Sequence, residues 1–118
     1  MTQEEKLLLL KDLCSRMPYG VKVITSVGGE IRNDKEQLNF AQLSLFEAGH
    51  EDIKPYLIPL EKLPQEKRDE YDSLLILSSD DIYYDTIKSI NWCYENHVDI
   101  NGLIDSGLAI DATGLNIY

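Results

Sequence analysis

The chain has 118 residues, 43% of them hydrophobic, and its 11 basic and 21 acidic residues give a formal net charge of -10. This length suits one domain with one core, so we expect residues 1–118 to form a single domain. No basic stripe is present, which argues against direct binding to nucleic acid. Acidic residues spread along a chain usually contribute only to solubility. The more specific interpretation is an acidic surface that docks on a basic partner protein.

The two cysteines indicate a reducing compartment. Cys14 and Cys93 each lie within an apolar helical pattern, with no further ligand at metal-binding spacing, so we expect buried thiols in a cytoplasmic protein. The leucine run 7–10 is flanked by charges and is too short for a signal peptide or a membrane span. We therefore expect no membrane association and no cofactor, and the sequence leaves the oligomeric state open.

A helix is predicted at the N-terminus. Thr2 and Glu5 have the spacing of a capping box, and Pro18 predicts the end of the helix because it restricts the residue before it. The face expected to be buried joins residues at three- and four-residue steps, namely Leu7, Leu10, Cys14 and Met17, with Leu13 beside them.

Beyond Gly20 the hydrophobic period changes to two. A run rich in β-branched residues predicts a strand over 21–26, followed by a tight turn at Gly28-Gly29 and a strand over 30–32. A polar turn is predicted at 33–34.

The middle of the chain is predicted as further sheet. Residues 37–47 are interpreted mainly as a strand, although 41–43 would also suit a helix. An extended segment over 53–57 contains Pro55, which has no N–H to donate, so we place this segment at a sheet edge.

Two helices are predicted next. The first covers 65–75, with Pro64 at its start and Tyr71, Leu74 and Leu75 facing inward. Residues 78–81 predict an N-cap for the second. This principal helix, 83–96, has its expected buried stripe at Tyr83, Ile87, Ile90, Cys93, Tyr94 and His97.

The predicted fold class is α+β. A small, mostly antiparallel sheet from residues 20–57, joined by a last strand near 108–111, is expected to pack against the N-terminal and C-terminal helices.

Few residues suggest chemistry. His97 and Asp99 are the weak catalytic candidates, since a carboxylate can orient an imidazole for base catalysis, yet no nucleophile accompanies them and a histidine at a helix end more often completes the cap. His50, with the acidic residues 51–52, is a weak metal candidate. The carboxylates of Asp80, Asp81 and Asp85 suit Mg²⁺, but helix capping explains them more simply.

Two aromatic residues are the binding candidates. Trp92 lies nearly opposite Ile90 on the principal helix and, with Tyr84, is able to line a ligand pocket or anchor a partner. The simpler interpretation places Trp92 between its helix and the N-terminal helix or a strand.

Three stretches resemble a widespread group of small uncharacterised proteins from gut anaerobic bacteria and their prophage-like mobile elements. They cover about half the chain, in the same order as in that group, and are residues 7–21, 53–57 with the following proline, and 92–110. The resemblance implies a shared fold and supplies no activity.

The chain departs from that group at two places. The group typically carries a Tyr-Arg pair where this chain has Ile100-Asn101, and a Ser-Ser-Met-Thr-like helix start where this chain has residues 61–64. The absent arginine weakens the idea that the turn before Gly102 binds an anion or a partner.

The sequence therefore favours a non-enzymatic interaction or accessory protein of a bacterial mobile element, with an acidic surface for a basic partner. The alternative is a small enzyme or ligand-binding protein that uses the region of His97, Asp99 and Trp92.

Overall fold

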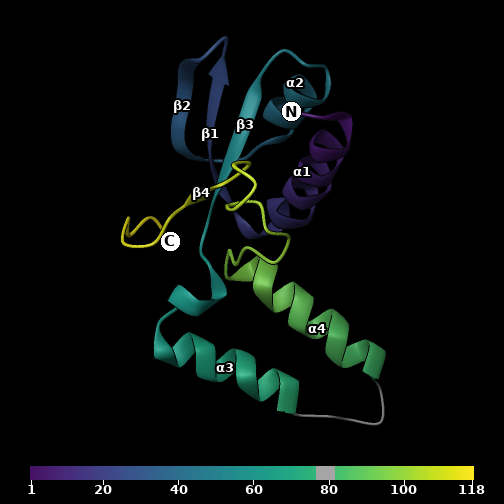
Figure 1. Cartoon of the computed structure of the whole chain (residues 1–118), viewed down its shortest axis with the longest axis vertical. Helices are drawn as coiled ribbons and strands as arrows, with labels where there is room; N and C mark the ends of the chain where they lie inside the picture. Colours follow the sequence, from purple (N-terminus) through teal and green to yellow (C-terminus); the bar gives the residue numbers. More distant parts are fainter. Residues whose placement is uncertain (77–81) are drawn as a thin grey trace.

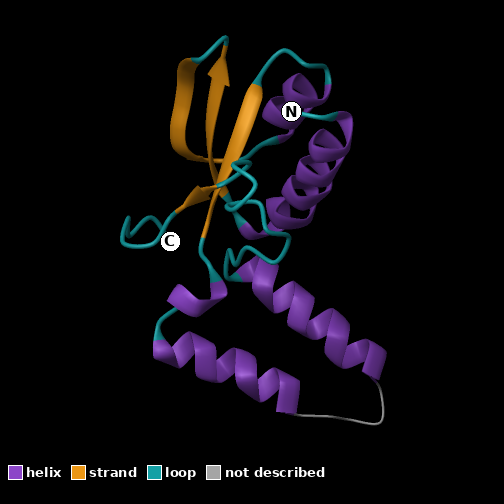
Figure 2. Cartoon of the chain, viewed as in Figure 1, coloured by secondary structure: helices purple, strands orange, loops and turns teal. Residues whose placement is uncertain are grey.

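The fold is α+β, as expected from the sequence (Figures 1 and 2). The structure, a computed structural model, describes the backbone of residues 1–76 and 82–118, and side chains within 1–74 and 87–118. Its described strands form one sheet with the order β2-β1-β3-β4. The β2-β1 and β1-β3 pairs are antiparallel, and β3-β4 is parallel.

Helix α1 (Gln3–Arg16) begins with the predicted capping box, in which Thr2 and Glu5 each accept a hydrogen bond from the other's backbone N–H. It ends at a short 3-10 turn, η1 (Met17–Tyr19), that contains Pro18. The predicted buried face of α1 is only partly correct, because Leu13 is buried and Leu10 and Met17 are half-buried against the core. The buried residues are Leu9, Asp12, Leu13 and Arg16, whereas Leu7 is 51% exposed.

Strands β1 (Lys22–Val27) and β2 (Glu30–Gln37) form the predicted hairpin through Gly28-Gly29, both of which have positive φ. No turn interrupts β2 at 33–34, so that prediction is wrong. The β1–β2 register instead shifts at two points, which accommodates the extra residues. β2 is charged and largely exposed, as suits an edge strand that must not pair with other chains.

Helix α2 (Phe40–Glu47) occupies most of the segment predicted mainly as strand, so the helical alternative was the correct one. Asn39 and Gln42 form a second capping box, in which each side chain accepts from the other residue's backbone N–H. Local capping therefore starts a helix where the alternation of apolar residues favoured a strand.

Strand β3 (Asp52–Leu57) confirms the extended segment around Pro55, but it lies inside the sheet and not at its edge. The prediction failed because β4 (Ile110–Asp111) is short. It pairs only with Tyr56 and Leu57, so it requires no N–H from Pro55.

The larger hydrophobic cluster lies between α1, α2 and one face of the sheet. Its buried residues come from all of these elements and from the segment before β4; they include Leu9, Leu13, Val23, Phe46, Ile53, Leu57 and Leu103. Figure 1 shows α1 and α2 side by side next to the sheet.

The second cluster belongs to a helical hairpin that extends away from the sheet and gives the molecule a long axis of 48 Å (Figure 1). The hairpin consists of α3 (Gln65–Ile76) and α4 (Ile82–Glu95), which follow the 3-10 turn η2 (Leu60–Lys62). Its cluster comprises Leu63, Trp92, Cys93 and Val98, against which Ile58, Leu60, Tyr71 and Leu74 pack.

The predicted buried stripe of α4 is correct at its end and wrong in its middle, since Tyr94 and His97 are half-buried. Cys93 is buried, but Ile87 is 58% exposed and Ile90 is 41% exposed. The helix turns its Trp92 side towards α3, because α3 is the element that packs along it. The side chains of Tyr83 and Leu75 lie outside the described residues, as do residues 78–81 of the predicted N-cap. No described helix is long and apolar enough to cross a membrane.

Candidate functional site

His97 completes the C-terminus of α4. Its φ of 61° is left-handed, its N–H donates to the Tyr94 carbonyl at 3.2 Å, and the Val98 N–H donates to the Cys93 carbonyl at 2.8 Å. This pair of bonds defines a Schellman motif with His97 in the position that glycine usually takes. The backbone role of His97 is thus to end the helix, as the simpler interpretation of the sequence held.

The imidazole of His97 is packed against the C-terminal segment. Its ring stacks on Tyr118 with 3.6 Å between centroids, and its Nδ1 atom is buried with no hydrogen-bond partner among the described residues. Burial, followed by the nearby positive charges of Arg16 and Lys22, lowers the pKa of His97 to about 4. The ring is therefore neutral at pH 7, so it is a base with little proton affinity.

Asp99 does not orient His97. Its two carboxylate oxygens accept hydrogen bonds from the backbone N–H groups of Leu103 and Ile104, both at 3.0 Å. These bonds fix the turn that precedes β4. The two catalytic candidates therefore do not act as a pair. His97 ends helix α4, and Asp99 fixes the turn that follows.

Trp92 is 7% exposed and lies between α4 and α3. Its indole N–H donates to Glu70 at 2.8 Å, and its ring contacts Tyr71 at a centroid distance of 5.4 Å. The simpler interpretation correctly expected Trp92 to be buried. Its neighbour, however, is α3 and not the N-terminal helix or a strand. The side chain of Tyr84, the other binding candidate, lies outside the described residues.

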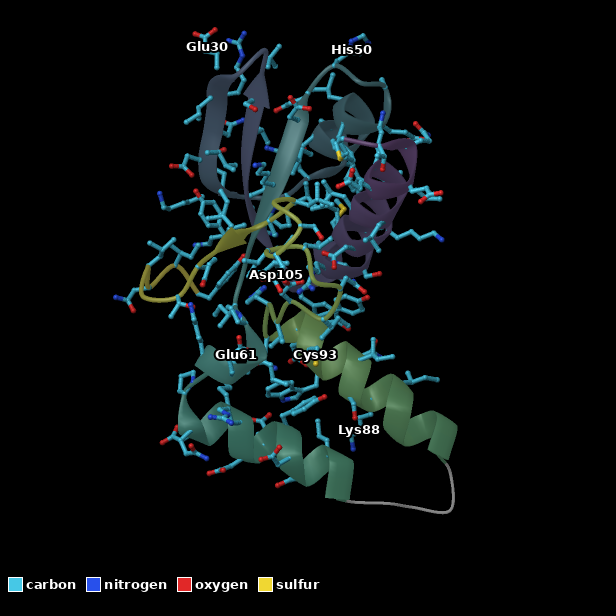
Figure 3. The ribbon with its side chains drawn as sticks, viewed as in Figure 1. Glu30, His50, Glu61, Lys88, Cys93 and Asp105 are labelled. Atoms are coloured by element: carbon cyan, nitrogen blue, oxygen red, sulfur yellow. The ribbon has the colours of Figure 1, made fainter. Side chains whose placement is uncertain are left out.

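The described structure gathers no set of metal ligands around His50. His50 and Asp52 are exposed near the start of β3, and His50 projects from one end of the molecule (Figure 3). Asp80 and Asp81, and the side chain of Asp85, lie outside the described residues. Within the described part of the chain, no group of three or more His, Cys, Asp and Glu residues is arranged to hold a metal ion.

A buried ion pair connects α1 to the end of α4. Arg16, which is 0% exposed, donates to the two carboxylate oxygens of Asp12 at 2.6 and 3.2 Å and to the Val98 carbonyl at 2.7 Å. Its guanidinium also lies over the Tyr94 ring, and Asn101 donates to Asp12. Sequence reasoning missed this pair, although the spacing of Asp12 and Arg16 by four residues in a helix was the available signal.

An apolar hollow lies between α1 and α2. We call it the Phe40 groove; it has a volume of about 320 Å³ and is lined by Cys14, Met17, Pro18, Phe40 and Leu43. Phe40 is 77% exposed at the first turn of α2, and Cys14 is exposed, contrary to the expectation of a buried thiol. Cys93 does fit that expectation, and burial raises the pKa of its thiol.

The Phe40 groove also explains why part of the predicted buried face of α1 is exposed. Leu7 and Leu10 continue the row formed by Cys14 and Met17, and this row meets α2 only in part, so its outer side stays in water. Sequence reasoning missed Phe40 because it assigned this segment to a strand. The capping spacing of Asn39 and Gln42 was the signal that would have placed Phe40 on a helix.

A larger hollow of about 610 Å³ lies between the start of α1, the sheet and the segment 106–108. Its lining is mixed: Ile24, Ile31 and Ile110 are apolar, whereas Asp52 and Lys54 are charged. None of the residues that suggested chemistry in the sequence converges there apart from Asp52.

Comparison with protein-family models, with curated proteins and with solved structures found no match for this chain. The resemblance to the small proteins of gut anaerobes and their mobile elements therefore stays a prediction.

Proposed function

We propose that this protein is a non-enzymatic interaction protein that binds a partner through the Phe40 groove. The observation that carries the proposal is the exposure of Phe40, 77%, beside a hollow whose lining residues are all apolar. Exposed apolar surface of this kind costs solubility, and it commonly marks a contact site for another protein. We further propose a cytoplasmic accessory role in a bacterial mobile element, which follows from the family resemblance.

The acidic composition supports a basic partner. A formal net charge of -10 creates a field that attracts positively charged proteins and speeds their encounter at low salt. The same charge disfavours direct contact with a nucleic-acid backbone. The apolar groove would then supply most of the binding energy, and the acidic surface would supply steering.

The alternative, an enzyme or ligand-binding protein that uses His97, Asp99 and Trp92, is less well supported. Asp99 is engaged by two backbone N–H groups, Trp92 donates to Glu70, and the His97 ring is stacked on Tyr118. Because these groups already serve the fold, a substrate would have to displace native contacts to reach them.

Affinity capture from the source organism, followed by mass spectrometry, tests the proposal. The unmodified protein and the variants Phe40→Asp and Leu45→Asp are used as baits in parallel. Leu45 is 43% exposed on the other side of α2, so it controls for the loss of an exposed apolar residue. We expect one specific protein that Phe40→Asp loses and Leu45→Asp retains. Co-purification of a metabolite with no specific protein would instead favour the ligand-binding alternative.

A further inference from the structure

We propose that the Phe40 groove binds an amphipathic helix of the partner, with bulky apolar anchors at its Phe40 end and basic residues at the opposite end. This inference rests on the proposed function and specifies the chemistry of the partner for the same surface.

The surface that α1 and α2 share has a direction because the two helices run antiparallel, and the Phe40 groove lies at one end of it. Cys14 and Met17, near the end of α1, share the hollow with Phe40 at the start of α2. At the other end, the Lys6 ammonium donates to the backbone carbonyl of Glu47 at 3.0 Å, which joins the beginning of α1 to the end of α2. A bound segment would therefore lie along both helices and meet two chemically different ends.

The length of the apolar row suits a helix. From Leu7 to Met17 the row spans ten helical steps, or about 15 Å at 1.5 Å per residue. A third helix laid between two antiparallel helices packs its ridge of side chains into the groove between them, with anchors at three- and four-residue steps. The row on α1 itself has this spacing, so the side chains of such a helix would fit between its leucines.

The charges at the second end determine which charge a partner helix should carry there. Glu47 lies seven residues after Phe40, hence on nearly the same face of α2, and Glu4 lies one turn before Leu7 on α1. Both carboxylates are exposed and have no ion pair within the described part of the chain, whereas the Lys6 ammonium is held against the helix end. The surface along α1 and α2 thus leads from the wholly apolar Phe40 groove to an end where carboxylates face water.

A partner helix with lysine or arginine about two turns from its apolar anchors would satisfy both ends. A second copy of this chain would not, because it also carries a net charge of -10 and would be repelled. Charge complementarity therefore favours a basic amphipathic helix over self-association.

A synthetic helix provides the test. The probe is a peptide about four helical turns long, built from alanine, leucine and lysine, with leucines at i, i+3, i+4 and i+7 and lysines in its last two turns. A second peptide has the same composition in an order that destroys the apolar stripe, and a third carries glutamate in place of lysine. Binding is measured by fluorescence anisotropy, and the contact site is mapped by NMR shift changes.

The patterned basic peptide is expected to bind with shift changes at the Phe40 groove. Phe40→Asp should weaken it by about thirtyfold, as removal of a central anchor does. Glu47→Lys should weaken it by about two- to fivefold and improve binding of the glutamate peptide, while Leu45→Asp should leave it unchanged. Phe40 and Glu47 are exposed, so circular dichroism should show all three variants folded.

Several results would overturn the inference. One is equal binding of the scrambled peptide, and another is an affinity insensitive to Phe40→Asp. The third is a concentration-dependent dimer that Phe40→Asp abolishes, because a second copy would then occupy the groove. If the peptide fails to bind while affinity capture still depends on Phe40, the proposed function stands and the helix inference fails.

Discussion

The two hydrophobic clusters of this protein are stabilised in different ways. The sheet cluster, between α1, α2 and the sheet, is a broad aliphatic core with the charged pair Asp12–Arg16 buried at its border. The hairpin cluster, between α3 and α4, is small and includes Trp92 and Cys93; Figure 3 labels Cys93 on α4. The first is covered from several sides, whereas the second is covered mainly by one partner helix.

Both helices that carry an apolar stripe, α1 and α4, leave part of their apolar surface exposed. α1 and α4 each have two faces with apolar residues, and in each the buried face is the one that packs against other elements of the fold. The remaining apolar residues, Leu7 on α1 and Ile87 and Ile90 on α4, stay exposed. Surplus apolar surface of this kind is available for partners.

Arg16→Met is expected to give the largest effect, in the sheet cluster. It leaves the Asp12 carboxylate, which is 1% exposed, without its counter-charge. Removing one partner of a buried ion pair typically costs about 3–5 kcal/mol of unfolding free energy. Urea denaturation followed by circular dichroism measures the loss.

The double variant Asp12→Leu/Arg16→Met separates the cost of a stranded charge from the value of the pair. Because both charges are then absent, it should recover much of the stability lost in Arg16→Met. A loss below about 1 kcal/mol in the single variant would contradict the burial of an essential pair.

Trp92→Ala is expected to act on the hairpin cluster alone. Loss of a buried tryptophan costs about 3 kcal/mol, and the hairpin makes few contacts with the sheet, so hydrogen exchange should accelerate in α3 and α4 while the sheet stays protected. Ile87→Ala, at a position 58% exposed on the same helix, is the matched control and should change stability by less than about 0.5 kcal/mol. Uniform acceleration over the whole chain would show that the two clusters unfold together.

Acidification is expected to weaken the junction between the two clusters. The pKa of His97 is about 4 in the folded protein, chiefly because of burial, and about 6.5 when unfolded. Between these values the unfolded chain binds a proton that the folded protein does not, so stability falls as the pH drops from 6.5 towards 4. The ring is partly exposed, which limits the loss to about 1–2 kcal/mol.

His97→Asn provides the comparison, since asparagine tolerates the left-handed backbone at this position. Urea denaturation at several pH values should show a slope between pH 6.5 and 4 for the unmodified protein and a flatter one for the variant. Equal slopes would assign the pH dependence to other groups.

Lys62→Met should give the smallest effect. Lys62 donates to Asp111 at 2.8 Å and thereby connects η2, at the base of the hairpin, to β4 of the sheet. This bond lowers the pKa of Asp111 to about 2. The pair is partly exposed, so its loss should cost less than about 1 kcal/mol and should depend on salt. Thermal melts at low and high salt measure it, and a larger loss at high salt would contradict this account.

The fold class and most element positions followed from local signals. The Thr2 capping box, Pro18, the Gly28-Gly29 turn and the apolar run around Cys93 each constrain only their own neighbourhood. A capping signal was also present at Asn39. It was outweighed by the alternation of apolar residues, which is weak evidence for a strand in a short segment.

What the sequence by itself determined is therefore most of the helices and strands, though not α2, because capping, turn chemistry and period act over a few residues. The tertiary structure alone decided which face of α1 and α4 is buried, what covers Trp92 and that Asp99 binds backbone instead of His97. Each of these depends on a neighbour distant in the chain, such as α3 for Trp92 or Val98 for Arg16. The hydrophobic period of a sequence shows which residues share a face of a helix. Packing decides whether that face contacts the rest of the protein, water or a partner.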